Sequence, residues 1–139
     1  MKYLLDTCVI SELVVKQPNE KVIQWIDNRD SKSVYLSVIT IGEIRKVIVK
    51  LPDSKRRELL EIWLNDELLV RFRGNILTIN ADVMLTWGEL IGRLELQGKK
   101  VAAMDSLIAA IALYGNFTLV TRNEDDFKNT GLNVVNPWN

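Results

Sequence analysis

Apolar and polar positions follow one another along this chain in short blocks that alternate between strand and helix patterns. Runs rich in strand-forming residues lie at residues 2–5, 33–37, 76–79, 117–120 and 133–135. Helical spacing or helix boundary signals lie between them, at residues 9–15, 18–28, 39–49, 53–65, 80–97 and 101–115. Strands separated by helices imply a mostly parallel sheet covered on both faces, so we expect an α/β fold with an α/β/α sandwich.

The length of the chain fits one compact domain. A chain of 139 residues can bury a core without disulfides or a structural metal, and no linker, repeat or low-complexity tract divides it. We therefore expect a single domain over residues 1–139. The apolar helical surface around Trp25, Ile26, Trp63 and Leu64 is generous for so small a domain and predicts a homodimer, with burial in the monomer core as the alternative.

Charge and residue content narrow the possible chemistry. Lys plus Arg and Asp plus Glu number 18 each, so no global positive field attracts nucleic acid, and any such contact must come from local patches. The chain has no histidine, which excludes histidine acid–base catalysis and imidazole ligands for zinc. Cys8 is the only cysteine, so an internal disulfide and a multi-cysteine zinc site are excluded too. Carboxylates, hydroxyls and cations must carry any chemistry.

The sequence predicts neither export nor a membrane span. Only residues 3–5 separate the initial Met-Lys from Asp6, which is too few for the apolar region of a signal peptide. The uncharged run at residues 106–121 contains Gly115 and Asn116 and is too short to cross a bilayer. A single cysteine also suits a reducing compartment. We expect a soluble, cytoplasmic protein with no membrane contact.

Asp105 is the residue that first suggests a function. It is the only charged residue between Lys100 and Arg122 and lies inside the apolar segment 101–113. A helix that is apolar on every side is normally buried, and an ionised carboxylate there must be protonated, paired with a cation or bound to a metal. The alternative is a hydrogen-bonded Asp near a helix start, which the helix dipole would favour.

Further oxygen ligands lie after the predicted strands, at the edge where parallel sheets bind their ligands. Asp6 follows the first strand directly, and Asn123 and Asp126 follow the strand that ends at residue 120. Glu43 lies early in the helix after the second strand and can turn toward the same edge. The helix that carries Asp105 must pack against the sheet. Several acids from distant parts of the chain should therefore meet, and without a cation they would repel one another.

Each of these residues also has a purely structural explanation. Asp6 and Thr7 could form an Asx-type turn. Thr40 and Glu43 fit a capping box, with Thr40 as the N-cap and Glu43 at the third helical position. The acids at positions 125 and 126 could be first-turn acids of a short surface helix.

If the acids converge, their chemistry favours a hard cation. A cluster of oxygen ligands without His or Cys favours Mg²⁺ or Mn²⁺ over zinc or copper. Such an ion activates water and stabilises charge on a phosphoryl oxygen. Phosphodiester hydrolysis is the reaction that such a site predicts.

Four segments resemble, in order, the motifs of the PIN-domain nucleases, particularly the bacterial VapC and FitB type. They are LLDTCVISE at residues 4–12, SVITIGEI at 37–44, AAMDSLIA at 102–109 and LVTRN at 119–123. The ending NPW at residues 136–138 is also similar to FitB. The resemblance spans essentially the whole chain and implies a PIN-like three-layer sandwich.

The resemblance also implies roles for particular residues. Asp6, Glu43 and Asp105 would bind metal directly or through water, and Asn123 would be the fourth polar position. The hydroxyls at positions 7 and 40, Thr7 and Thr40, would orient the acids and water. Two positions depart from the family pattern, because Cys8 stands where Asn is common and Asn123 where many members have Asp. Asp126 could supply the missing acid, and the sequence leaves that choice open.

The resulting expectation is a Mg²⁺-dependent endoribonuclease, with Mn²⁺ as a possible substitute, that acts as the toxin of a type II toxin–antitoxin pair. The resemblance further implies an RNA substrate, a homodimer and a cognate protein antitoxin, with operator DNA contacted only indirectly through that antitoxin. Two alternatives remain, a non-catalytic RNA-binding module on the same scaffold and a phosphoacceptor domain. The absence of an acidic pair beside Asp6 counts against the phosphoacceptor. The RNA target, the cleavage position, the antitoxin and the number of metal ions stay open.

Overall fold

The fold is built on a five-stranded, all-parallel sheet in the order β3-β2-β1-β4-β5. The computed structural model describes residues 1–139. Its strands are β1 (Tyr3–Leu5), β2 (Val34–Ser37), β3 (Ile76–Leu77), β4 (Thr118–Val120) and β5 (Val134–Val135). Its α-helices are α1 (Thr7–Glu12), α2 (Glu20–Asp27), α3 (Val38–Val49), α4 (Lys55–Ile62), α5 (Leu69–Arg71), α6 (Ala81–Leu96) and α7 (Ala103–Gly115). Three shorter segments are the 3₁₀ helices η1 (Ser31–Ser33) and η3 (Glu124–Phe127) and the π-helix η2 (Trp63–Leu68).

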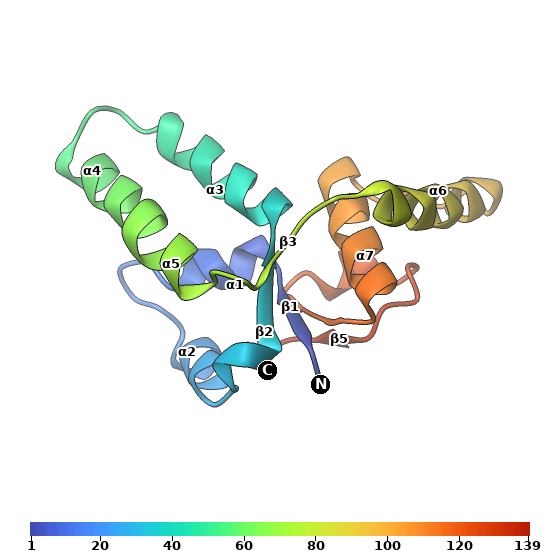
Figure 1. Ribbon diagram of the computed structural model, residues 1–139, viewed down its shortest axis with the longest axis horizontal. Helices are drawn as coiled ribbons and strands as arrows, with labels where there is room; N and C mark the ends of the chain where they lie inside the picture. Colours follow the sequence, from blue (N-terminus) through green and yellow to red (C-terminus); the bar gives the residue numbers. More distant parts are fainter.

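Alternating side chains of the central strands pack into two separate hydrophobic cores. In β1, Leu5 packs into the core shared with α1, α2 and α3, whereas Leu4 packs into the core shared with α6 and α7. In β4, Val120 and Leu119 repeat this division. Figure 1 shows α1 to α5 on one side of the sheet and α6 and α7 on the other. The predicted three-layer sandwich with a parallel sheet is therefore confirmed.

The helix predicted at residues 53–65 differs from the structure at both ends. Ser54 rather than Asp53 caps α4, because the Ser54 Oγ accepts a hydrogen bond of 3.2 Å from a backbone N–H three residues on. The helical path continues past residue 65 through η2 and α5. Leu64 and Leu68 are buried along this continuation. Their packing outweighs the polar stretch at residues 65–67, which in the sequence looks like a helix end.

The apolar surface that predicted a dimer lies within the monomer. Ile26 and Leu64 are 2% and 3% exposed, and Trp25 and Trp63 pack against the same core. The Trp25 ring meets Tyr3 edge-on, with 5.0 Å between ring centroids. Burial in the monomer core is therefore the correct explanation of these residues, and using them as the reason for a dimer was wrong.

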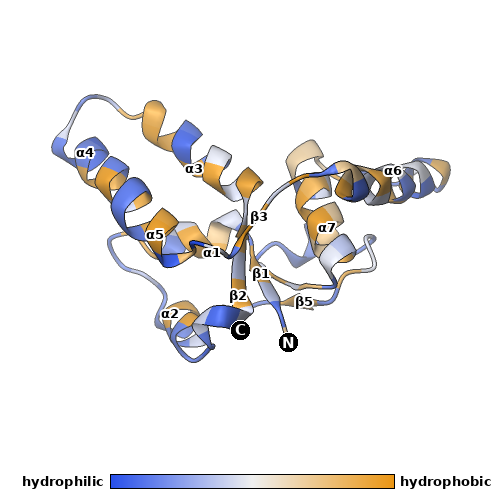
Figure 2. Cartoon of the chain, in the orientation of Figure 1, coloured by the Kyte–Doolittle hydropathy of each residue, from blue (hydrophilic) through white to orange (hydrophobic).

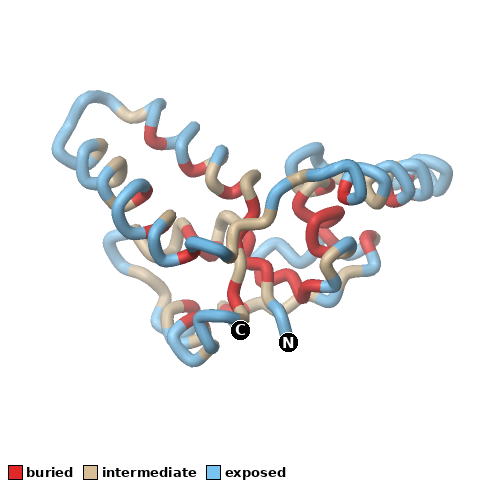
Figure 3. The backbone as a smooth tube through the Cα atoms, viewed as in Figure 1, coloured by how far each residue is buried: buried red, intermediate tan, exposed pale blue.

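Helix α7 is buried along most of its length, as its sequence predicts, but its first turn is not. Figures 2 and 3 show a helix that is largely hydrophobic and buried where it meets the sheet. Met104 is 51% exposed and Asp105 is only half-buried, so the expectation of a helix enclosed on all sides was wrong at this end. The helix ends as predicted, with Asn116 in the left-handed conformation at φ 58°. No helix of the structure is both long enough and apolar enough to cross a membrane.

Candidate active site

Asp6 lies at the carboxyl end of β1 and is held by hydrogen bonds to both carboxylate oxygens. Its Oδ1 accepts from the Thr7 backbone N–H at 2.8 Å, and its Oδ2 accepts from Thr121 Oγ1 at 2.7 Å. The first bond caps α1, so the structural explanation of Asp6 applies to one of its oxygens. Burial raises the pKa of Asp6 and the charge of Glu43 adds to this rise, while the bonds from Thr121 and Thr7 oppose it.

The Thr7 side chain links α1 to α3 through hydrogen bonds. Its Oγ1 donates to Glu43 Oε1 at 2.6 Å and lies 2.9 Å from Thr40 Oγ1. The capping-box explanation of Glu43 is wrong, because Ser37 caps α3 and its Oγ accepts from the Thr40 N–H at 3.3 Å. The Glu43 carboxylate instead contacts the residue next to Asp6.

The carboxylate of Asp105 takes part in no hydrogen bond of the structure. It lies in the first turn of α7, whose N-cap residue Ala102 provides no side-chain cap. Burial, and to a lesser extent the charges of Asp6, Asp126 and Glu43, together raise the pKa of Asp105 to about 6. No hydrogen bond opposes this rise, so the structure gives no support to a merely hydrogen-bonded Asp. Acids from four distant segments therefore lie within electrostatic range of one another.

The loop after β4 provides a backbone contact and an exposed acid. The Asn123 N–H donates to Thr121 Oγ1 at 3.0 Å, whereas the Asn123 side chain makes no capping bond to η3. Asp126 lies in the first turn of η3, as its structural explanation predicts. Its charge nevertheless raises the pKa of Asp105 more than the charge of Glu43 does. The structure thus brings Asp126, rather than the Asn123 amide, into the electrostatics of the cluster.

Two side chains around Asp6 received no role from the sequence. Thr121 is fully buried, and its hydroxyl donates to Asp6 and accepts from the Asn123 N–H. Cys8 Sγ donates to Asp6 Oδ2 at 3.8 Å, lies 3.5 Å from Thr121 Oγ1 and accepts from the Arg122 N–H at 3.5 Å. Burial raises the pKa of the Cys8 thiol, so it stays protonated and can donate. One signal for Thr121 was available, because it and Asp6 each directly follow one of two paired strands.

The donor set fits a hard divalent cation that keeps part of its water shell. The charged groups that act on Asp105 are the carboxylates of Asp6, Asp126 and Glu43, and such oxygen donors suit Mg²⁺ or Mn²⁺. No three acidic or cysteine side chains are grouped so that they could hold a metal ion by themselves. Mg²⁺ is usually bound through one or two carboxylates and several waters, which agrees with this looser arrangement. The carboxylate of Asp105 has the most free capacity for coordination.

An apolar groove of about 330 Å³ borders the acids along α1, α3 and α4. Thr7 and Glu43 belong to its lining. Most of the remaining lining is aliphatic or aromatic, and Lys46 and Arg56 add two positive charges. Glu43, the one acid of the cluster in this lining, therefore borders a surface that suits an apolar segment better than a bare phosphate chain.

Comparison with known proteins agrees with this geometry. The family model described as "PIN domain" matches residues 3–132. The chain is 40% identical to the plasmid stability protein StbB of Pseudomonas syringae pv. tomato, with 97% of each chain covered. It is 35% identical to the VapC ribonuclease Y4jK of Sinorhizobium fredii, covering 97% of this chain and 96% of that protein. It is 37% identical to the toxin FitB of Neisseria gonorrhoeae, again over 97% of each.

A solved structure gives the same result for the fold. The crystal structure of FitAcB from Neisseria gonorrhoeae superposes with a TM-score of 0.93 at 37% identity, covering 98% of both chains. The parallel sheet and the two helical layers described above thus agree with the match of the family model. The chain belongs to the PIN-domain family and is of the VapC and FitB type.

Proposed function

We propose that this chain is a Mg²⁺-dependent endoribonuclease that hydrolyses RNA phosphodiesters and acts as the toxin of a type II toxin–antitoxin pair. The observation that carries the proposal is the convergence of Asp6, Glu43 and Asp126 on Asp105, whose pKa is raised to about 6 by burial and by the charges of these three acids. Such a cluster is unfavourable in a free protein unless it serves a cation. The ribonuclease and toxin named among the relatives support the reaction and the role.

In this proposal each residue of the site has a distinct role. Bound Mg²⁺ would supply water activation and neutralise charge on the phosphoryl oxygens. Asp6, Glu43 and Asp105 hold the cation directly or through water, with Asp6 fixed by Thr121 and Glu43 fixed by Thr7. Thr40, 2.9 Å from the Thr7 hydroxyl, sets the orientation of that hydroxyl.

Asp126 is our choice for the fourth acid. Its carboxylate influences Asp105 electrostatically, and Asp126 is exposed to solvent. Asn123 then serves through its backbone N–H, which completes the hydrogen bonding of Thr121. The departure from the family pattern at position 123 therefore does not remove the charge that the site needs.

The apolar groove beside Glu43 is the basis for the proposed partners. We propose that a cognate antitoxin covers the apolar groove next to Glu43 and so blocks the access of RNA to the acids. Operator DNA would be contacted through the antitoxin alone, and the RNA substrate places the activity in the cytoplasm. A reading frame beside the gene that encodes a small DNA-binding protein would support this pairing. Binding of that protein without loss of RNA cleavage would contradict it.

A homodimer remains part of the proposal on different grounds. The exposed apolar side chains of α6 include Leu85 at 68% and Leu96 at 92%, and Met104 is exposed on the adjacent α7. We also propose that residues 1–139 fold as one unit. Light scattering at micromolar concentration tests the dimer, and a monomer mass alone would contradict it.

The decisive experiment uses purified chain and single-stranded RNA. Cleavage is expected with Mg²⁺ or Mn²⁺ and is expected to stop in EDTA. Asp105→Asn, prepared in parallel, controls for host nuclease. Undiminished cleavage by the wild-type chain in EDTA would refute the metal mechanism. Retention of RNA without any cleavage in Mg²⁺ would favour the non-catalytic RNA-binding module instead.

A further inference from the structure

The loop that leaves β4 carries a positive charge that the proposed reaction does not use. Arg122 is exposed and lies between Thr121, which donates to Asp6, and Asn123. None of the three ion pairs in the structure includes it. A free guanidinium therefore lies in the same loop as the residues that complete the acidic site.

The backbone of Arg122 is fixed close to Asp6. Cys8 Sγ accepts a hydrogen bond of 3.5 Å from the Arg122 N–H and itself donates to Asp6 Oδ2 at 3.8 Å. One sulfur atom thus contacts both the Arg122 backbone and the Asp6 carboxylate. The arginine side chain therefore begins next to the acidic site and is long enough to reach a neighbouring part of a bound strand.

The guanidinium has a defined place. Its Cζ lies 5.0 Å from the centre of the Trp138 ring, and Trp138 itself packs against the core. The acid closest to it in the loop, Glu124, accepts a hydrogen bond of 3.0 Å from Asn136 Nδ2. Stacking on the ring leaves the N–H donors at the edge of the guanidinium plane free, since stacking uses only its face.

We propose that Arg122 binds a backbone phosphate of the RNA strand beside the bond that is cleaved. This inference rests on the proposed function and names a residue that binds the substrate. An RNA strand that approaches Asp6, Asp105 and Asp126 meets like charge, and the chain as a whole has a net charge of zero. A local cation must offset this repulsion, and the planar donors of arginine match two phosphate oxygens at once.

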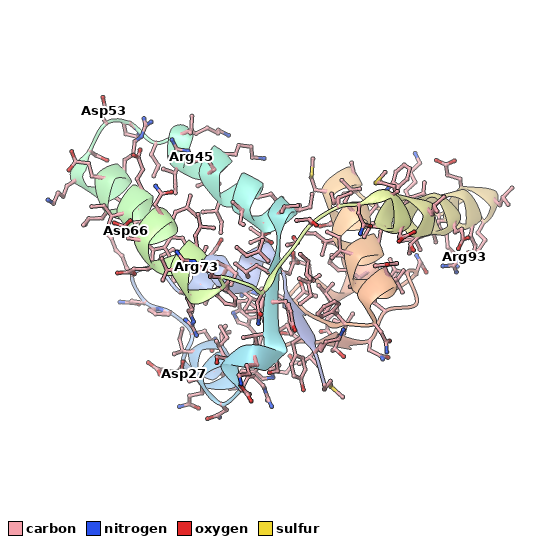
Figure 4. All side chains as sticks on the ribbon, in the orientation of Figure 1. Asp27, Arg45, Asp53, Asp66, Arg73 and Arg93 are labelled. Atoms are coloured by element: carbon pink, nitrogen blue, oxygen red, sulfur yellow. The ribbon has the colours of Figure 1, made fainter.

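The test compares Arg122→Gln with Arg73→Gln. Arg73 is also exposed and takes part in no ion pair. It directly precedes β3, the outer strand on the opposite side of the sheet from β4 and β5 (Figure 4). Each variant binds a fluorescein-labelled single-stranded RNA oligonucleotide, which gel electrophoresis shows to be uncleaved. Fluorescence anisotropy gives the dissociation constant at several salt concentrations, and a thermal melt verifies the fold.

Arg122→Gln is expected to weaken binding about tenfold at low salt. It should also lower the slope of log K against log salt by about 0.7, the change for one contact with a single-strand phosphate. Arg73→Gln should match the wild type in both quantities, and Arg122→Lys should keep the slope because it keeps the charge. A merely structural role for Arg122 would lower the melting temperature without changing the slope.

An unchanged slope in Arg122→Gln, or wild-type binding that does not depend on salt, would overturn the assignment of Arg122. Neither result depends on cleavage. The EDTA experiment described above tests the proposed function separately, so the two proposals can fail independently. If Arg122→Gln weakened inhibition by the antitoxin while the RNA slope stayed the same, the phosphate contact would likewise be refuted.

Discussion

The two halves of the candidate site are built differently. On the β1 side, Asp6 is 4% exposed with hydrogen bonds to both oxygens, and Glu43 accepts a bond from Thr7. On the α7 side, Asp105 is half-buried without a hydrogen bond, and Asp126 is exposed. Folding alone fixes the first half, Asp6 and Glu43, which we call the fixed half. The second half, Asp105 and Asp126, keeps carboxylate oxygens free for a ligand, and we call it the free half. This difference is the basis for our proposal that a cation completes the site from the α7 side.

The free half also carries an electrostatic cost. The pKa of Asp105 is raised to about 6 from its ordinary value of 3.8, so its ionised form is less stable in the folded protein than in the unfolded chain. Below pH of about 3.8 the group is protonated in both states and the penalty is absent. It grows between about pH 4 and 6 and is fully present above that range. Binding of Mg²⁺ to the folded state alone would offset it.

Removal of charge from the free half should give the largest effect. Asp105→Asn is expected to lower RNA cleavage at least about 1,000-fold, because loss of a direct ligand removes several kcal/mol of transition-state stabilisation. Asp27→Asn, an exposed acid at the end of α2 (Figure 4), is the matched control and should cleave like the wild type. Initial rates on labelled RNA measure both, and comparable rates for the two variants would end the assignment of Asp105.

A smaller loss of activity is expected when Asp6, in the fixed half, loses a hydrogen bond. Thr121→Val removes the hydroxyl that donates to Asp6 Oδ2 and is expected to lower activity about 10- to 100-fold, the usual range for a residue that orients a metal ligand. It should also lower the free energy of unfolding by about 1–3 kcal/mol, because a buried acceptor loses its partner. Thr121→Ser should restore most of the activity, measured in cleavage and urea-unfolding assays. Equal losses in the Ser and Val variants would show that the hydroxyl is unimportant.

Stability without metal gives the third test, and here the two halves should respond in opposite directions. Asp105→Asn should raise the stability of the metal-free protein at pH 7 by about 1 kcal/mol, a value reduced for the solvent screening of this half-exposed group. The corresponding rise in melting temperature is about 3 °C. The advantage should disappear at pH 4, where Asp105 is protonated. Thermal melts at the two pH values would contradict this account if the variant were less stable at pH 7.

The smallest expected difference separates the candidates for the fourth polar group. Asp126→Asn should slow cleavage about tenfold, since its charge influences Asp105. Asn123→Ala should change the rate by less than about threefold, because the Asn123 contact to Thr121 comes from the backbone and survives the substitution. Single-turnover cleavage rates resolve the two, and the reverse order would make the Asn123 amide the fourth group.

The sequence predicted the elements of this fold well because their apolar patterns are local. The strands at β1, β2 and β4 and the apolar α7 needed no knowledge of distant contacts. The continuation of α4 through η2 was missed, because only tertiary packing of Leu64 and Leu68 reveals it. For the same reason, burial in the monomer was not the preferred explanation of the apolar surface around Trp25 and Trp63. The periodicity of a sequence does not show which partner covers an apolar face.

The candidate site was predictable where chemistry is tied to topology. Acids after parallel strands converge because those strands end at one edge, which is why Asp6 could be selected. Asp105 could be selected because it is the only charged residue in an apolar helical segment. The resemblance implied that Thr7 orients an acid, but it did not identify that acid as Glu43, which lies 36 positions away. Likewise the sequence did not assign Thr121 and Cys8 to Asp6, since their contacts depend on the pairing of β1 with β4.

The central claim is that a divalent cation binds between the fixed half and the free half of the site. Paramagnetic broadening of amide NMR signals by Mn²⁺ tests it most directly and does not depend on RNA cleavage. The account predicts that signals around Asp6, Glu43 and Asp105 broaden at low Mn²⁺ while those at the far end of α6 stay sharp, and that Asp105→Asn requires much more Mn²⁺ for the same effect. Broadening centred instead on the exposed acids of α4 and η2, or none at all, would contradict it.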